Sequence, residues 1–217
     1  VCRRGCEFVR SSGKLRKIGA AIMRIEVDMA DYPTYFAKGS DKVCFVGEKY
    51  PDRILKVSPL ENCRPMRIEV SYLERLERLG RTADFMPKYY GWFKNDKYIG
   101  YVHQLVKSDS IIPLQKYIDL HADDLSLIEE KLAELKEKIL SSKILVLNIH
   151  AQNILVDVSN MHLWLIDGYG TPEAIPLPYW FDVCRRRKEE SHWAKFERRY
   201  GRLKAAAQLR LRERKAD

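Results

Sequence analysis

The sequence predicts an α+β protein with a small β-rich N-terminal lobe and a compact, mostly helical C-terminal lobe. Short runs rich in valine, isoleucine and aromatic residues dominate the first half, whereas apolar residues at helical spacing dominate the second. With 217 residues, 46% of them hydrophobic, the chain can bury one core or two small lobes that share a cleft. An order of strands, one helix, more strands and then mostly helices is typical of the α+β class.

The first lobe is expected over residues 23–106, as a β-sheet with one helix. The helix is predicted over 64–80, because apolar residues recur there every three or four positions and a glycine ends the pattern. These apolar positions are Met66, Val70, Leu73, Leu76 and Leu79. Strands rich in β-branched and aromatic residues are predicted at 42–46, 53–58, 87–93 and 97–106.

The second lobe is expected over residues 107–200. Helices are predicted around 113–121 and over 124–142. A short turn joins two predicted strands, 153–158 and 162–167, into a hairpin. The apolar positions of the second helix are Leu125, Ile128, Leu132, Leu135 and Ile139.

Basic residues gather at the two ends of the chain. Residues 1–22 carry six Lys/Arg and one Glu, and residues 184–217 carry thirteen Lys/Arg and five acidic residues, so the part between them is mildly acidic. A long helical region is expected from about 179 to 214, broken or kinked near Gly201, with 201–217 as a basic helical tail. Contact of these ends with nucleic acid or an anionic surface is one class of function, although a dedicated nucleic-acid binder places its basic stripe on the folded face.

No apolar run approaches the roughly 18 residues of a membrane-spanning helix, so no membrane span is expected and the cytoplasm is the expected location. Residues 1–22 are expected as a basic N-terminal extension. The stretch that opens at Met23 reads as the natural start of the chain, which makes residues 1–22 a product of an early start assignment or a flexible extension.

Four polar residues follow an order that phosphoryl transfer requires. Such a site needs a cation on the nucleotide phosphates, a group that fixes this cation, and oxygen ligands for Mg²⁺. Lys56 lies on a predicted strand with Leu55 and Val57 facing the other way, and Glu69 on the next helix is placed to pair with it. The remaining two residues, separated by the length of a hairpin, are Asn153 and Asp167.

The loop NIHAQNILV, residues 148–156, resembles the catalytic loop of the protein-kinase-like fold, and its aminoglycoside and choline kinase branch in particular. That branch has the pattern D-x-H-x-x-N, which His150 and Asn153 match and Asn148 does not. The resemblance implies a bilobal kinase-like fold that binds ATP and Mg²⁺. Lys56 would bind the α- and β-phosphates, held by Glu69, and Asn153 and Asp167 would ligate the ion. His150 would lie near the γ-phosphate, and the hinge that meets adenine would be Gln104, Leu105 and Val106.

A narrower resemblance, over most of residues 30–200, is to the YrbL family of small bacterial kinase-like proteins linked to the PhoP magnesium-response network. Its specific part is the segment IPLPYWFDVCRRRKEESHWAKF, which has a structural interpretation as well, as an amphipathic helix that packs Trp and Phe onto the lobe. The matching residues are Pro176, Leu177, Trp180, Cys184, Arg187, Trp193 and Phe196.

Asn148 stands where an active kinase has an aspartate that accepts or orients the proton of the acceptor hydroxyl. An amide orients a hydroxyl but does not take up its proton. The sequence therefore predicts a Mg-ATP-binding protein with weak or atypical phosphotransfer to a small-molecule or protein acceptor, His150 being either a substitute base or a loop histidine bonded to backbone. The alternatives are a catalytically silent regulator that uses the cleft for interaction, and a basic-tail nucleic-acid-associated protein.

Overall fold

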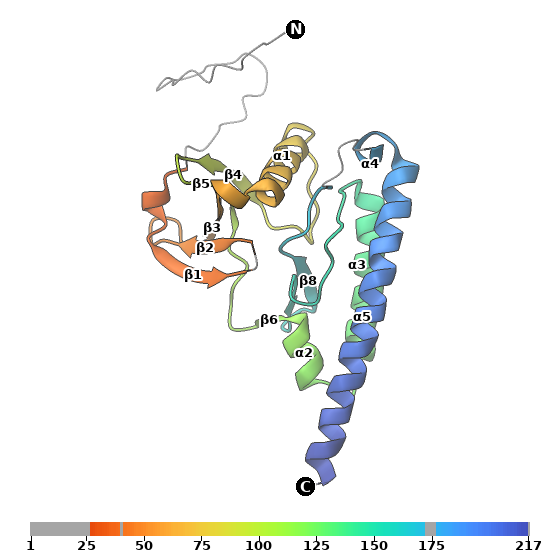
Figure 1. Ribbon diagram of the computed structural model, residues 1–217. Helices are drawn as coiled ribbons and strands as arrows, with labels where there is room; N and C mark the ends of the chain where they lie inside the picture. The colour runs from red at the N-terminus through yellow and green to blue at the C-terminus, as the bar shows by residue number, and fades with distance from the viewer. Residues whose placement is uncertain (1–26, 40, 172–176, 217) are drawn as a thin grey trace.

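The chain is described here by a computed structural model that covers residues 27–39, 41–171 and 177–216 (Figure 1). One lobe consists of a β-sheet and one helix, and the other lobe is mostly helical, which confirms the two-lobed α+β fold. The predicted extension at 1–22, the expected start at Met23 and Pro176 of the family segment lie outside the described residues. Within those residues, no helix is long and apolar enough to cross a membrane.

The N-terminal lobe is a five-stranded antiparallel sheet in the order β1-β2-β3-β5-β4, with helix α1 packed against β4 and β5. The elements are β1 (Thr34–Lys38), β2 (Val43–Val46), β3 (Arg53–Pro59), α1 (Arg64–Arg78), β4 (Tyr89–Lys94) and β5 (Tyr98–Gln104). The predicted apolar face of α1 is buried except at Leu79, which is 49% exposed because the helix has ended there. Gly80 follows with φ +60°, a left-handed helix end.

The two faces of the sheet divide the residues of β3 as the alternation predicts. Leu55 and Val57 are buried in a small apolar cluster with Val102 on one face. Lys56, between them, points to the opposite face, toward the second lobe. The ammonium group of this lysine therefore lies in the space between the lobes.

The C-terminal lobe is built on α2 (Leu114–Leu120), α3 (Ser126–Ser142) and α5 (Asp182–Ala216), with a short helix α4 (Leu177–Trp180). A three-stranded sheet, β6-β7-β8, carries the predicted hairpin. Its strands are β6 (Ile111–Pro113), β7 (Ile154–Asp157) and β8 (His162–Leu165). All five predicted apolar positions of α3 are buried, as expected for its core face.

Helix α5 runs unbroken through Gly201, so the predicted break at this residue is wrong. A Cβ built on Gly201 meets nothing within 4 Å, and an isolated glycine in an exposed helix costs only about 1 kcal/mol relative to alanine. Beyond it, Leu203, Ala207 and Leu211 still pack on the main core. The expected tail, as far as the structure describes it, is thus a continuation of α5.

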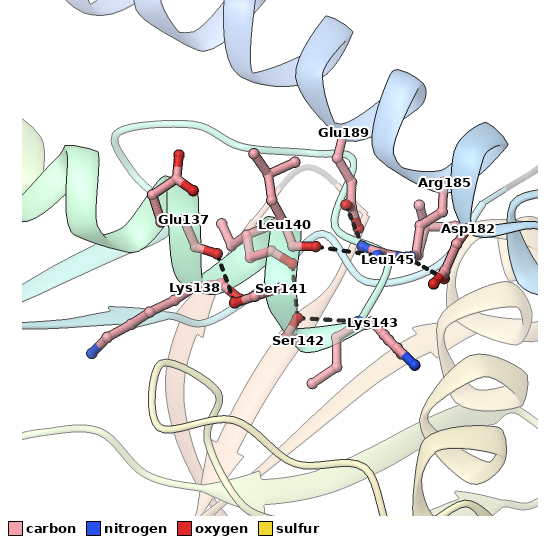
Figure 2. A network of polar contacts seen from close by, with 12 residues as sticks. Glu137, Lys138, Leu140, Ser141, Ser142, Lys143, Leu145, Asp182, Arg185 and Glu189 are labelled. Carbon is pink, nitrogen blue, oxygen red and sulfur yellow. Dashed lines mark hydrogen bonds and ion pairs between the residues drawn. The ribbon is translucent and has the colours of Figure 1, made fainter.

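Arg185, which forms a buried ion pair within α5, ties the first turns of this helix to the end of α3 (Figure 2). Arg185 Nη1 donates to Glu189 Oε2 at 2.6 Å, and Nη2 donates to the Leu140 carbonyl at 3.1 Å. Further along, Trp193 and Phe196 are buried, which confirms the amphipathic interpretation for that part of the family segment. At its start the interpretation fails, because Leu177 and Trp180 are 43% and 60% exposed.

We predict that Gly100→Ala destabilises the fold and that Gly201→Ala stabilises it. A Cβ on Gly100 would lie 2.1 Å from the Lys56 carbonyl oxygen across the β3–β5 ladder, where backbone atoms have no room to move. Urea unfolding should show a loss of roughly 2–3 kcal/mol for Gly100→Ala and a gain of about 1 kcal/mol for Gly201→Ala. Equal effects of the two substitutions would contradict both placements.

Candidate functional site

Buried and more exposed residues alternate over 147–151, at the start of the catalytic-like loop. Leu147, Ile149 and Ala151 are buried in the main core, whereas Asn148 is exposed and His150 is half-buried between them. This pattern is that of an extended segment with one face on a core. The apolar residues of the loop therefore fix the direction in which Asn148 and His150 point.

The segment DGYG, residues 167–170, packs against this loop backbone to backbone. Leu147 N–H donates to the Gly168 carbonyl at 2.9 Å, and Gly170 N–H donates to the Leu145 carbonyl at 3.0 Å. Gly168 has φ +98°, and a Cβ there would lie 2.8 Å from the Asn148 carbonyl oxygen. Only glycine fits this close approach, so Gly168 sets the distance between Asn148 and Asp167.

The hairpin brings Asp167 back beside Asn153, as the fourteen-residue spacing predicts. Ile166 N–H donates to the Asn153 carbonyl at 2.9 Å. The Asn153 side-chain nitrogen donates to the Asn148 carbonyl at 3.2 Å, which leaves the amide oxygen as the atom that is free to act as a ligand. An amide oxygen and a carboxylate at adjacent strand ends are a donor set that suits Mg²⁺ with several waters.

The cation that holds Glu69 is Lys42, which the sequence reasoning did not identify. Lys42 precedes β2, and its ammonium bonds both the Glu69 carboxylate and Asp167 Oδ1, the latter at 2.5 Å. Its side chain is 13% exposed, and that of Glu69 is 6% exposed. One lysine thus joins the sheet, α1 and the end of the β7–β8 hairpin.

Lys56 bonds a different partner from the one expected. Its Nζ donates to the Ile166 carbonyl at 2.7 Å, one residue before Asp167. The expected Lys56–Glu69 ion pair is therefore not formed among the described residues: Lys42 bonds Glu69 Oε2, and Oε1 is buried with no hydrogen-bond partner there. Both ammonium groups lie over the Tyr101 ring, 5.8 Å and 5.9 Å from its centroid.

Burial and charge act in opposite directions on the ionisable groups of this cluster. Burial lowers the pKa of Lys56, and the nearby charge of Lys42 lowers it further. Burial also raises the pKa of Glu69 to about 7, although the Lys42 charge opposes this. For Asp167, burial disfavours ionisation, but the charges of Lys42 and Lys56 outweigh it and hold the pKa well below its usual value. Asp167 is therefore anionic at neutral pH.

The three hinge residues are only partly available to a ligand. Gln104 N–H donates to the Lys88 carbonyl and Leu105 N–H to the Asp52 carbonyl, both at 2.8 Å. An adenine ring would have to use the carbonyl groups of the hinge or the backbone of Val106. Just before the hinge, His103 is buried, and its Nε2 has no hydrogen-bond partner among the described residues.

His150 contacts helix α5 rather than backbone. Arg199 Nη1 lies 2.9 Å from Nδ1 and 3.1 Å from Nε2 of the His150 ring. Burial lowers the pKa of His150, and the Arg199 charge lowers it further. The imidazole is consequently neutral at physiological pH, and neither of the two roles expected for it included this partner.

A separate groove of about 260 Å³ lies elsewhere, lined by residues of α3 and of the β7–β8 hairpin. Its lysines are engaged, since Lys131 bonds Glu134 and Lys138 bonds Asp84. In the described ranges, no group of three or more His, Cys, Asp or Glu is placed to hold a metal ion. A magnesium site built on Asn153 and Asp167 therefore has two protein ligands and needs further oxygens from a phosphate or water.

The sequence holds different amounts of information about the site roles of Lys42 and Arg199. Cys44 pairs with Lys56 across β2 and β3, so Lys42, two residues before Cys44, lies on the same face as Lys56. The register that reveals this relation is a property of the fold. Arg199 is one of many basic residues in α5, and nothing in the local sequence separates it from its neighbours.

We predict that the contribution of Glu69 to the free energy of unfolding falls as the pH rises from about 4.5 to about 7. A group with a pKa of about 7 when folded and 4.5 when unfolded binds more protons in the folded state between these values. Its contribution to the unfolding free energy is thus fully present below about pH 4.5, and it is lost as the pH rises to about 7.

Urea unfolding of wild type and Glu69→Gln from pH 4.5 to 8 tests this, with Glu77→Gln on the exposed side of α1 as control. The advantage of wild type over Glu69→Gln should shrink by up to about 3 kcal/mol across the window. Parallel pH profiles for the two proteins would show that Glu69 does not titrate there.

The chain is similar to the YrbL proteins of Escherichia coli (strain K12) and Shigella flexneri. Each is 26% identical over 141 residues, which is 61% of this chain and 67% of the relative. A solved structure, the crystal structure of Rad53 1-466 in complex with AMP-PNP, has a TM-score of 0.49 and 15% identity over 64% of this chain and 39% of that chain. A TM-score of that size is too low to support a conclusion about this protein.

The family description that matches the chain is "PhoP regulatory network protein YrbL", and the match covers residues 30–201. That range agrees with the extent over which the sequence resembles the family. It includes the whole cluster of Lys42, Lys56, Glu69 and Asp167, and the part of α5 that contacts His150. The chain belongs to the YrbL family of PhoP regulatory network proteins.

Proposed function

We propose that this protein binds Mg-ATP between its lobes and transfers the γ-phosphoryl group slowly. The observation that carries the proposal is the meeting of a buried lysine, Lys56, and a partly buried one, Lys42, with an ionised Asp167 at the end of the hairpin. Lone charges are not buried without partners, because desolvation of an unpaired ion costs several kcal/mol. A largely buried charged cluster of this kind, with residues from both lobes and with Asn153 beside Asp167, is typical of a site for charged ligands.

Lys42 and Lys56 supply the positive charge for the phosphates. Glu69 balances one of them, so the cluster of two cations and two carboxylates is close to neutral when all four are ionised. Asp167 Oδ1, which would help to hold a magnesium ion, is bonded by the Lys42 ammonium in this structure. We expect Mg-ATP to displace Lys42 from Asp167 and to keep this lysine beside its phosphates.

Asn153 and Asp167 are the residues that would hold the ion. Their oxygens fit the preference of Mg²⁺ for hard donors, and the ion would neutralise charge on the β- and γ-phosphates when bound. The adenine would lie against the hinge at Gln104–Val106, where one ring nitrogen of the neighbouring His103 has no hydrogen-bond partner in the part of the chain that the structure describes. Two functions are thus divided between the two lobes: the N-terminal lobe binds the nucleotide and the hairpin orients its phosphates.

Asn148 limits the rate of transfer rather than binding. It lies beside the site, since its carbonyl accepts from Asn153 and contacts Gly168. Because the transition state is loose, loss of a catalytic carboxylate lowers the rate by roughly 10²–10⁴-fold without abolishing it. Membership in the YrbL family supports a bacterial regulatory setting for such a slow enzyme.

We predict that Mg-ATP raises the melting temperature of wild type and that the charged cluster is required. At 100 times its dissociation constant a ligand stabilises by about 2.7 kcal/mol, or roughly 5–10 °C for this length. Lys56→Met and Lys42→Met should each lose most of the shift, whereas the exposed Lys116→Met should keep it. A full shift of the melting temperature in Lys42→Met would show that Lys42 is not part of the nucleotide site.

We predict that Asn148→Asp increases ATP hydrolysis by roughly 10²-fold or more, with Asp167→Ala as the inactive control. The readout is release of inorganic phosphate, which requires no knowledge of the acceptor. If Mg-ATP binds but neither wild type nor Asn148→Asp turns it over, the protein is the silent regulator that uses the cleft for interaction only.

A further inference from the structure

Helix α5 carries a basic stripe that runs along the catalytic-like loop. The stripe is defined by Lys188, His192, Lys195, Arg199 and Arg202, which recur every three or four residues and therefore lie on one side of the helix. This side is not the one that binds α3. Glu189 and Glu197 point elsewhere, to Arg185 and to the Trp193 indole.

Three contacts place the stripe beside the site. Lys188 Nζ donates to Thr171 Oγ1 at 3.2 Å, just after the DGYG segment. The His192 ring contacts the Leu147 backbone, next to Asn148, and Arg199 lies on the His150 ring. The stripe thus borders both the segment that carries Asp167 and the loop that carries Asn148.

The contact of Arg199 is an unusual one for a guanidinium. One nitrogen is within 3.1 Å of both ring nitrogens of His150, and a single N–H cannot point at two lone pairs at once. A guanidinium is a five-donor group that prefers a carboxylate or phosphate, often through two parallel bonds. Among the described residues, Arg199 has no carboxylate partner of this kind.

Asn148 adds no negative charge beside the basic stripe. An aspartate at this place would repel an anion from the acceptor side of the loop, whereas the amide is neutral. Asp167, the nearest carboxylate of the hairpin, is already bonded by Lys42. The acceptor side of the loop is therefore bordered by cations without a nearby uncompensated acid on the loop itself.

We propose that the acceptor is a small hydroxyl compound that carries a phosphate or carboxylate group, bound by Arg199 and Lys195 of the basic stripe. This inference rests on the proposed phosphotransfer and names the chemistry of its second substrate. The hydroxyl oxygen of the acceptor forms a bond to the γ-phosphorus as the bond from that phosphorus to the β–γ bridging oxygen breaks. ADP leaves, and the hydroxyl proton passes to the neutral imidazole of His150 and then to water.

The anionic group has a second effect in this scheme. In the protein alone, Arg199 Nη1 lies within 3.1 Å of both ring nitrogens of His150. An anion that pairs with the guanidinium would draw Arg199 away from the ring and leave a ring nitrogen open to the acceptor hydroxyl. The missing carboxylate at Asn148 would thereby be replaced by a base that the anionic group of the acceptor uncovers.

The test is a titration of the His150 ring by nitrogen-detected NMR, without nucleotide, with inorganic phosphate, acetate and choline as probes. Phosphate should shift the His150 signals in a saturable way, because it pairs with the guanidinium that lies on the ring, whereas cationic choline should leave them unchanged. A response to phosphate alone assigns a phosphorylated acceptor, and a response to acetate as well assigns the broader anionic class.

Arg199→Gln should weaken the phosphate response at least roughly tenfold, and Arg186→Gln, the same charge change on the opposite side of α5, should leave it intact. Equal responses in the two variants, or none in wild type, would overturn the proposal. Because no nucleotide is present, a failure here is separate from a failure of Mg-ATP to stabilise the protein.

Discussion

The ion cluster of Lys42, Glu69 and Asp167 is the interaction on which the arrangement of this protein depends. It is the point at which the sheet, helix α1 and the β7–β8 hairpin are joined by charge rather than by apolar packing. Breaking one member of a buried pair leaves an uncompensated ion, which costs roughly 3–5 kcal/mol. In the proposed function, an anionic nucleotide and its metal ion would bind at the same cluster, so stability and ligand binding would depend on the same groups.

In the proposed function, the site would have two states, which differ in the cation that is bonded to the Asp167 carboxylate. In the protein as described, the Lys42 ammonium is bonded to Asp167, and the segment before β2 is thereby fixed over the site. Under the proposed function, Asp167 would bind a magnesium ion in place of Lys42, and the lysine would move to the phosphates. Exchange of one cation for another at this carboxylate would avoid an unpaired, partly buried Asp167, which a site with a lone aspartate would not do.

Much of the fold followed from local sequence pattern, but the partners within the site did not. The alternation around Lys56 and the helical spacing in α1 and α3 predicted their buried faces correctly, because both depend on a period that the local sequence carries. The hairpin spacing likewise placed Asp167 beside Asn153. The Lys42–Glu69 pair depends on strand register, and the Arg199–His150 contact depends on where a helix fifty residues away docks. Gly201 was misjudged because helix propensity is a weak preference that packing on either side overrides.

Paramagnetic broadening by Mn-ATP tests the central claim most directly, because a bound Mn²⁺ ion broadens only the backbone amide signals near it. If the ion binds at Asp167 and Asn153, the amides of Asn153 and of residues 167–169 should disappear first, and Lys42→Met should reduce the effect. Signals of the groove between α3 and β8, which includes Lys131 and Met161, should remain sharp. Broadening confined to that groove, or no broadening at all with ATP present, would contradict the assignment of the cluster as a nucleotide site.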